Sequence, residues 1–572
     1  MRRIAIIALV GCAGPRPFPL RAPFVRDTDL DSVALPCRPD PTPKEPDRKS
    51  CAPTYDVSPF IWDQVDNTVF ARLSRGFSVH LAGEAVNANS LDEVPDSAWF
   101  TNRPREAVTT QSDAAPGACK PEDMLPSQEQ VPDGTWVIDH GKDNGASLGF
   151  RVDVPGKGLY LLKADDPGHP ELASAASVIG AELYDALGFN TTCEQIVVIR
   201  KGQLKLTPGL TGSDNMGIVH PFDDKALDLA LAGSTQVAGG FVRFQASKWL
   251  PGLTIGPFHF TGTRRDDPND AIDHEDRREL RGSRILAAWM NHWDSREQNS
   301  MDVWMADDPT DKRSSPGHVV HYILDTSDAF GGLGGPRETG VMQGYTYFLD
   351  VPDVLRAMFT FGFDERPWER ATVTPGHETF NYFRVEDFEP EHWKGSYPSA
   401  PFLAMSERDA AWMARLIARF SAADLHRIAA HGKFRDPTDA PWLADLMVAR
   451  QRRILERYLM RLSPLGEIHA EGTDQICATD FARLREVVPA AKFHYAILER
   501  GGGRVIRLRP HPTPDGKVCF TTQPIIGGSH PDGDPAERVT ITVENGTAAG
   551  PLVIHAYDLG VRGMHVAGID RP

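Results

Sequence analysis

A short apolar run at the N-terminus constrains where the rest of this chain folds. Arg2 and Arg3 precede seven apolar residues, 4–10, and Gly11 follows them. The run is too short to span a bilayer, which takes about 20 residues. A positive start, a short apolar core and a small residue are typical of a secretory signal peptide. The first strand of a buried sheet is the alternative, but the sequence becomes Pro-rich at once. We therefore predict that residues 1–11 are a signal peptide.

The residues around Cys12 resemble the lipobox of bacterial lipoproteins, since they read Leu9-Val10-Gly11-Cys12. The resemblance implies that the mature protein begins at Cys12 and is held on a membrane by acyl chains on that residue. Residue 13 is Ala rather than Asp, which in Gram-negative sorting favours the outer membrane. The expected location is the cell envelope, on the periplasmic or surface face.

Charge and composition exclude some partners. The formal net charge of −17 argues against binding to nucleic acid and to anionic headgroups. A chain with 41% hydrophobic and 24% charged residues is ordinarily globular. Its 572 residues allow two to four domains.

The cysteines after Cys12 are even in number, which predicts disulfides in an oxidising compartment. Many pairings are possible, but proximity in the sequence favours Cys37–Cys51 and Cys477–Cys519, leaving Cys119 with Cys193. No C-x-x-C pair occurs, so a zinc or thioredoxin-like site has no support.

Hydrophobic periodicity divides the chain and predicts an α+β fold. Three strands are expected within 135–163, a helix at about 170–187, and further strands at 194–200, 240–245, 301–305 and 319–324. Helical patterns dominate from Val351. The predicted units are a Pro-rich tether over 12–55, an N-terminal decoration and linker over 56–133, a strand-rich unit over 134–252, a mostly helical unit over 253–465, and a β-rich domain over 466–572.

One polar cluster carries a pattern of chemical interest: His292-Trp293-Asp294-Ser295-Arg296-Glu297-Gln298-Asn299. It resembles the catalytic loop of protein kinases, H-R-D-L-K-x-x-N. Phosphoryl transfer needs an Asp to accept the proton of the attacking hydroxyl, a cation beside the moving group and an Asn that holds a metal ion. Asp294, Arg296 and Asn299 would fill these roles. The alternative is a polar loop between a helix and a strand.

Three further features follow the order that a kinase requires: a lysine, a glutamate and an aspartate. Lys163 ends the third strand, and in a kinase the lysine there binds the phosphates. The next helix carries Glu171 and Glu182, either of which could hold that lysine. Asp325 ends an apolar strand after the catalytic loop, where a kinase places a metal-binding Asp. Taken singly, Lys163 could be a solvated lysine and Glu171 a charge favoured by the helix dipole.

On these residues, the region 136–465 resembles the atypical kinases, namely the HipA-type, CotH-type and secretory-pathway kinases. Several stretches also look like an uncharacterised family of exported bacterial proteins. The resemblance implies a bilobal domain with an N-lobe over 134–252 and a C-lobe over 253–465. It also implies Mg²⁺ or Mn²⁺ with ATP or another phosphoryl donor. In that family the recurrent glutamate begins the helix, which favours Glu171 over Glu182.

The sequence departs from the kinase pattern at two motifs. Gly145-Ala146-Ser147-Leu148-Gly149 is not the G-x-G-x-x-G loop, although Gly145 and Gly149 are the candidates for approaching the donor. Asp325-Thr326-Ser327 replaces D-F-G, and Asp328 nearby is a rival metal ligand.

Two other functions fit parts of the pattern. A kinase fold without activity could bind a protein or glycan partner, and the β-rich C-terminal domain would suit that role. A metal-dependent hydrolase could be built on the acidic stretch 266–274, although it lacks the ligand register of a calcium loop.

Overall fold

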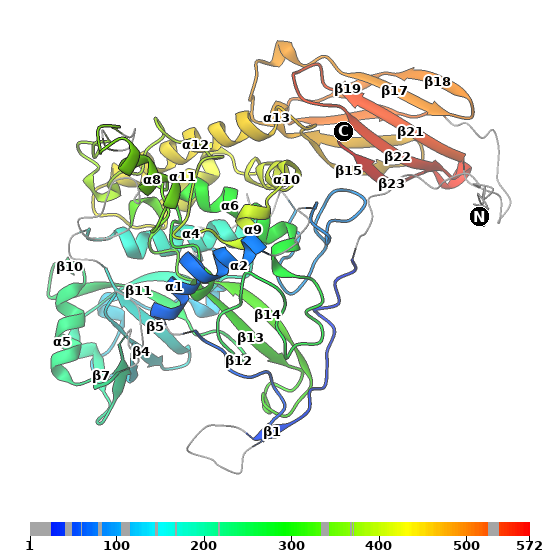
Figure 1. The fold of residues 1–572 in the computed structure, drawn as a ribbon. Helices are drawn as coiled ribbons and strands as arrows, with labels where there is room; N and C mark the ends of the chain where they lie inside the picture. Colours follow the sequence, from blue (N-terminus) through cyan, green and yellow to red (C-terminus); the bar gives the residue numbers. More distant parts are fainter. Residues whose placement is uncertain are drawn as a thin grey trace, which may run out of the picture.

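The computed structural model describes residues 25–39, 49–58, 60–77, 83–104, 115–142, 147–165, 169–214, 218–332, 343–365, 369, 371–523 and 537–572. Cys12 and Gly145 lie outside these residues, so the predicted lipidation site and one glycine of the predicted pair have no structural account. The fold is mixed α+β (Figure 1), which confirms the predicted class.

A seven-stranded sheet forms the first large unit. Its order is β10-β11-β5-β4-β3-β7, with β6 pairing to β11, and only β3 and β7 are parallel. Side chains alternate in and out of the core, so that Phe150, Tyr160, Leu162 and Phe244 are buried together on one side. The strands are β3 Trp136–Gly141, β4 Gly149–Val154, β5 Gly158–Ala164, β6 Glu194–Ile199, β7 Leu204–Leu206, β10 Gln236–Val237 and β11 Phe241–Lys248.

Helix α4, Leu172–Ala186, connects this sheet to the rest of the molecule. It follows β5, as the sequence predicts, and all but one of its residues are buried. One side packs against β6 and β11, and other sides meet the helical region. Such a helix has no solvent face to carry charges, so its acidic side chains need partners.

A three-stranded sheet, β12-β13-β14, lies next in the chain order. In it, Ser300 at the start of β13 pairs with Ile323 at the end of β14. The residues just before β13 and just after β14 therefore share one edge. Helix α6 lies between β12 and β13 in the chain and ends at Met290, directly before the His292–Asn299 loop. The bounds are α6 Arg278–Met290, β12 Leu253–Thr254, β13 Ser300–Ala306 and β14 Gly317–Ile323.

Most of the remaining helices form one apolar core with α4 and α6. Trp289, Trp412, Met413, Ile428 and Met447 are fully buried in it. These helices are α9 Ala400–Ala404, α10 Glu407–Ile417, α11 Ala422–Ala430 and α12 Asp439–Tyr458; α8, Val351–Phe359, lies at the surface.

Two antiparallel sheets fill the C-terminal part (Figure 1). Their inner faces share a core that includes Ile476, Phe520, Ile541 and Ile554. The four-stranded sheet contains β15 Leu465–Glu471, β16 Gln475–Asp480, β20 Lys517–Thr521 and β19 Pro510–Pro512. The five-stranded sheet contains β18 Arg504–Leu508, β17 Ala496–Gly501, β21 Glu537–Glu544, β22 Leu552–Asp558 and β23 Met564–Asp570. The short helix α13, Phe481–Leu484, follows β16.

The N-terminal segment corrects the predicted tether. Residues 25–39 and 49–58 run along the folded body instead of standing free of it. Asp27 pairs with the fully buried Arg277 at 2.5 Å, and the backbone of Val33 exchanges hydrogen bonds with that of Gly317. The physical reason is ion pairing across more than two hundred residues, which local composition does not reveal. Helices α1 (Phe60–Val65) and α2 (Ala71–Phe77), joined by a π-helix, then cross the front of the molecule (Figure 1).

All three disulfides favoured by the sequence are present: Cys37–Cys51, Cys119–Cys193 and Cys477–Cys519. They indicate a non-reducing, extracytoplasmic environment. Among the described residues, no helix combines the length and the apolar character needed to cross a membrane.

Candidate active site

Lys163 lies near the end of β5, between two neighbouring strands. Gly149 on β4 and Gln245 on β11 are its partners in register. A Cβ at Gly149 would lie 2.3 Å from the carbonyl oxygen of Leu162, so only glycine allows β4 to approach β5 this closely. The Lys163 side chain is mostly buried, and its Nζ lies 3.0 Å from Oδ2 of Asp325.

Asp325 follows β14 with a left-handed backbone, at φ 49°. Its side chain remains 34% exposed and accepts a hydrogen bond of 2.6 Å from Ser327 Oγ. Desolvation alone would raise the pKa of Asp325. The positive charge of Lys163 and the Ser327 hydroxyl outweigh it, so the pKa lies below its usual range. Asp325 is therefore an ionised carboxylate with access to solvent.

The predicted pairing of Glu171 with Lys163 is not formed. Glu171 has φ 73° just before α4, and its carboxylate accepts a 2.8 Å hydrogen bond from the backbone N–H of Arg435. Glu182 instead pairs with Arg427 at 2.9 Å and with His431 at 2.6 Å. Both glutamates thus bind the α11 region and the residues that follow it, because α4 lies against that helix.

The buried acid on the lysine side of the sheet is Glu194 of β6. Burial raises the pKa of Glu194, and Lys163 is the foremost influence that lowers it. Glu194 also accepts hydrogen bonds from Thr192, Gln245 and Ser247. The sequence offered one signal for it, since an acidic residue opens an otherwise apolar strand.

The catalytic-loop candidate Asp294 is held on several sides. Asn299 Nδ2 donates to its Oδ2 at 3.0 Å and to its backbone carbonyl at 2.8 Å. Arg296 Nε lies 2.9 Å from its Oδ1. Burial, with the negative charges of Asp328 and Asp325, raises the pKa of Asp294 to about 7. A carboxyl with this pKa can accept a proton near neutral pH.

Asp328 and His292 hold the loop in place through buried hydrogen bonds and contacts. Asp328 Oδ2 accepts a 2.7 Å hydrogen bond from the backbone N–H of Asp294. His292 is buried, with Nδ1 at 3.0 Å from the Tyr184 hydroxyl and Nε2 at 3.4 Å from Asp328 Oδ1. Burial lowers the pKa of His292 to about 4, so the ring is neutral and acts as a brace. Asp328 positions Asp294, which gives the predicted rival a different role.

Lys142 is a site residue that sequence reasoning missed. Its Nζ donates to the carbonyl of Ser147 at 2.8 Å. Burial and the charge of Lys163 lower the pKa of Lys142 to about 8. The site therefore places a second lysine beside Lys163. Lys142 directly follows a strand, just as Lys163 lies near the end of one. This shared position was the feature of the sequence that could have identified Lys142.

The donor set suits a small oxygen-binding cation. Mg²⁺ is usually bound by one or two protein oxygens, while waters and substrate phosphates complete its shell. The carboxylate of Asp325 and the amide of Asn299 fit that pattern. Asn299 and Leu324 share the β13–β14 edge, since the Leu324 N–H donates to the Asn299 carbonyl at 2.9 Å.

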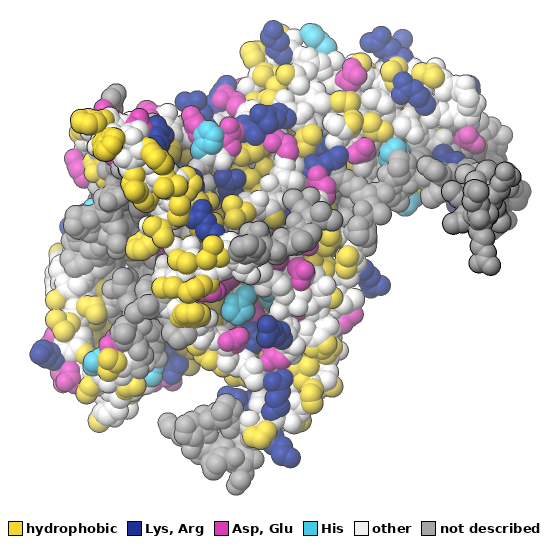
Figure 2. All heavy atoms as spheres, viewed as in Figure 1, with side chains coloured by type: hydrophobic (Ala, Val, Ile, Leu, Met, Phe, Trp, Pro, Cys, Tyr) yellow, Lys and Arg dark blue, Asp and Glu magenta, His cyan; other side chains and the backbone are white. Residues whose placement is uncertain are grey.

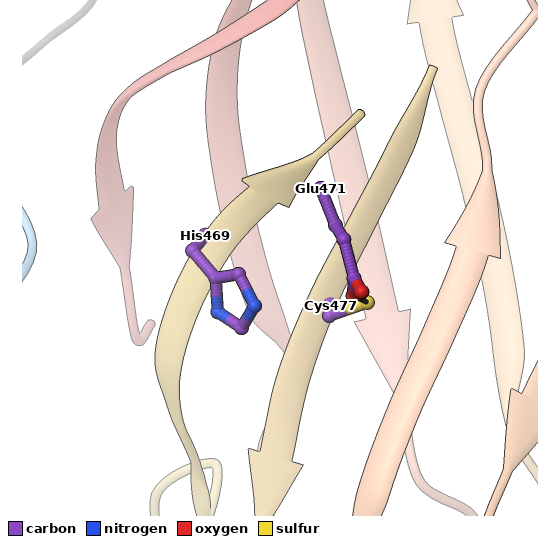
Figure 3. A group of neighbouring side chains, drawn as sticks. All are labelled: His469, Glu471 and Cys477. Carbon is purple, nitrogen blue, oxygen red and sulfur yellow. Dashed lines mark hydrogen bonds between the residues drawn. The ribbon is translucent and has the colours of Figure 1, made fainter. Parts of the chain in front are cut away.

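Another group of possible ligands lies in the C-terminal sheet (Figure 3). Within the described residues, His469, Glu471 and Cys477 bring three potential ligand atoms within 4.8 Å of one another. However, Cys477 is bonded to Cys519 and has no thiolate to offer. His469 and Glu471 are exposed strand residues, so this group is part of the ordinary polar surface of the sheet and does not form a metal site.

A cavity of about 770 Å³ lies beside the His292–Asn299 loop. Most of the residues that line it come from the ranges 54–74 and 257–266. From the His292–Asn299 loop, Glu297 lines it. His259 Nδ1 in this wall lies 3.4 Å from Glu297 Oε2. Neither Lys163 nor Asp325 lines it, so the cavity and the Lys163–Asp325 pair are separate features.

Comparisons with protein-family models, with curated proteins and with solved structures found no match.

Proposed function

We propose that this protein is an extracytoplasmic, metal-dependent phosphotransferase of the atypical kinase type. The proposed fold is bilobal, with an N-lobe over 134–252 and a C-lobe over 253–465. The observation that carries the proposal is a convergence. Lys163 precedes the Asp294–Asn299 loop and Asp325 by more than a hundred residues, yet the three form one connected cluster.

Each side chain has a role that its surroundings support. Asp294 accepts the proton of the acceptor hydroxyl, because its raised pKa makes it a usable base near neutral pH. Lys163 binds phosphate oxygens of the donor as a point charge. Asp325 and Asn299 would hold Mg²⁺ or Mn²⁺, which neutralises charge on the donor phosphates. Arg296 balances negative charge beside Asp294.

A non-catalytic binding protein is the second candidate. Lys163 and Asp325 already satisfy one another, and so do Arg296 and Asp294. Such closed pairs are what a kinase-like fold without a donor would keep. The C-terminal sheets would then bind a protein or glycan partner.

We also propose that the chain is a lipoprotein of the cell envelope, anchored by lipid on Cys12 and sorted to the outer membrane. The three disulfides support an extracytoplasmic location. The lipobox-like residues before Cys12 support the anchor.

Calorimetric titration of the full chain with Mn²⁺ and ATP tests the enzyme proposal. Asp325→Asn should weaken metal-dependent binding by roughly 10-fold or more, because the metal loses its charged protein ligand. Asp294→Asn should keep that binding but lower phosphoryl transfer by roughly 10²-fold, as expected when a general base is lost. Asp139→Asn, which removes a surface partner of Arg151, serves as the matched control.

The result separates the two candidates. Metal-dependent binding with transfer that responds to Asp294 supports the phosphotransferase. Binding that is equal in all four proteins and independent of metal contradicts it. No binding by any of them favours the non-catalytic role.

A further inference from the structure

Two helical segments expose apolar side chains in unusual number. Figure 2 shows such side chains gathered over α8 and, across the same face of the molecule, around α1. Monomeric soluble proteins rarely expose large contiguous apolar surfaces to water. Where such a surface is exposed, it usually marks an interaction site. We call this surface the apolar face. Its residues are Trp62, Val65, Val69, Phe70 and Leu73 in the first segment, and Phe348, Leu349, Val351, Val354, Leu355, Met358, Phe359, Phe361 and Phe363 in the second.

Helix α8 has no buried residue at all. Beyond its C-terminal end the exposure increases, from 81% for Phe359 to 87% for Phe361 and 91% for Phe363. The helix itself contains two charged residues, Asp353 and Arg356, and Arg356 pairs with Asp364. The surface is therefore mainly apolar, and its aromatic rings are highly exposed to solvent.

Helices α1 and α2 place the other half of the apolar face over the catalytic loop. Trp62 and Phe70 stack on the outer side with ring centroids 5.7 Å apart. On the inner side, Asp63 is buried within reach of the charges of Glu297 and Arg296. Gln298 of the loop also donates to the carbonyl of Ser58 at 3.2 Å. The apolar rings thus lie one helix away from the loop.

We propose that the apolar face docks on a phospholipid bilayer, with the rings of α8 and α1 entering its interfacial region. The short stretch of chain between Cys12 and the first described residue favours a membrane as the binding partner of this face. Val25 follows Cys12 by thirteen positions, which span at most about 45 Å when fully extended. A lipid on Cys12 therefore keeps the body next to a membrane. Projecting aromatic rings suit a fluid phase, which closes around them without a matching groove.

Docking on a membrane rests on the proposed lipid anchor at Cys12, which brings the protein to the bilayer. It does not rest on the proposed phosphoryl transfer. The test removes the anchor. In the full chain with Cys12→Ser, co-sedimentation with vesicles of the zwitterionic lipids phosphatidylethanolamine and phosphatidylcholine is measured with and without Phe359→Ser, Phe361→Ser and Phe363→Ser. Both chains keep the same N-terminus, so their difference reports the face alone. Val505→Ser with Val561→Ser is the control, since these exposed valines lie elsewhere.

The triple variant should lower the partition coefficient by roughly 10-fold or more, while the control variant leaves it unchanged. Three highly exposed side chains contribute little to the core, so the melting temperature should stay the same and any loss of partition reports the surface. Equal partition of all chains overturns the proposal. It is overturned equally if the parent chain self-associates through this face in sedimentation velocity while partition does not respond. Transfer assays of the Asp294 variant fail or succeed independently of this result.

Discussion

Carboxyl groups around the His292–Asn299 loop are buried against one another, and this makes single residues sensitive to pH. Asp63 of α1 illustrates the effect outside the proposed metal ligands. Burial raises its pKa to about 7, the charge of Glu297 adds to the rise, and Arg296 and His259 oppose it. Its Oδ1 accepts a 3.1 Å hydrogen bond from Asn67. The folded chain therefore binds a proton at Asp63 more tightly than the unfolded chain does.

The sign of the resulting stability effect follows from linkage. An unfolded aspartate titrates near pH 4, so the contribution of protonated Asp63 is complete below that pH and is lost as the pH rises through about 7. Asp63→Asn should reduce this loss by about 1–2 kcal/mol. The measurement is urea unfolding at about pH 4.5 and about pH 8. Asp153→Asn, which removes one negative charge from an exposed strand position, is the control, and identical pH profiles for Asp63→Asn and the parent would contradict the prediction.

At the scale of elements, α4 governs the position of Asp325. The hydroxyl of Thr326, the residue after Asp325, donates to the carbonyls of Ala176 and Ser177 at 3.3 and 3.2 Å. This approach depends on Gly180, because a Cβ there would lie 2.4 Å from Thr326 Oγ1. The helix thus fixes the position of the Asp325–Asp328 turn.

Gly180→Ala should destabilise the protein by about 1–3 kcal/mol, since the overpacking exceeds the gain in helix propensity of about 1 kcal/mol. It should also weaken metal-dependent donor binding, if that binding is found, because Asp325 must shift. The matched control is Gly233→Ala at the end of α5 (Asp224–Gly233), where the Cβ would make ordinary contact with Leu148 at 3.5 Å. Urea unfolding compares the two variants, and equal stability of both would contradict the role given to Gly180.

The elements themselves were largely predictable, because local patterns determine them. Alternation in the sequence predicts three strands within 135–163, and the structure has strands at Trp136–Gly141, Gly149–Val154 and Gly158–Ala164. The helix expected at about 170–187 is Leu172–Ala186. The partner of Lys163 was not predictable in this way. Glu171 and Asp325 are both acidic residues at element ends, and only the packing of α4 against α11 decides that Glu171 turns away.

The limits of sequence reasoning are similar at the scale of the site. Asp294 and Asn299 are five residues apart in one short loop, and a hydrogen bond of 3.0 Å joins them. Lys142 and Glu194 reach the same cluster through the register of the sheet. No spacing in the sequence encodes that register. The packed N-terminal residues 25–39 were missed for the same reason, as their partners lie far along the chain.

At the scale of the whole molecule, one buried carboxylate joins segments from four parts of the chain. Asp92 Oδ1 lies 2.7 Å from Arg278 of α6, and its Oδ2 lies 2.9 Å from Arg571 at the C-terminus. Arg415 of α10 approaches Oδ2 at 3.6 Å. Arg571 also donates to the carbonyl of Ser463 at 2.8 Å, just before β15. This cluster fastens the C-terminal sheets to the helical core.

Asp92→Asn should therefore cost about 3–5 kcal/mol, because buried arginines lose the charge that compensates them. Asparagine tolerates the left-handed backbone at this position (φ 61°), so the loss reports charge rather than strain. Burial would raise the pKa of Asp92, but the three arginines lower it, so its contribution is present above about pH 4 and is lost as the pH falls further. The difference in unfolding free energy between variant and parent should accordingly shrink in acid. Asp96→Asn, at an exposed position of the same loop, should change the unfolding free energy by no more than about 0.5 kcal/mol. Equal urea unfolding curves for the Asp92 and Asp96 variants at neutral pH would show that the C-terminal sheets are held in some other way.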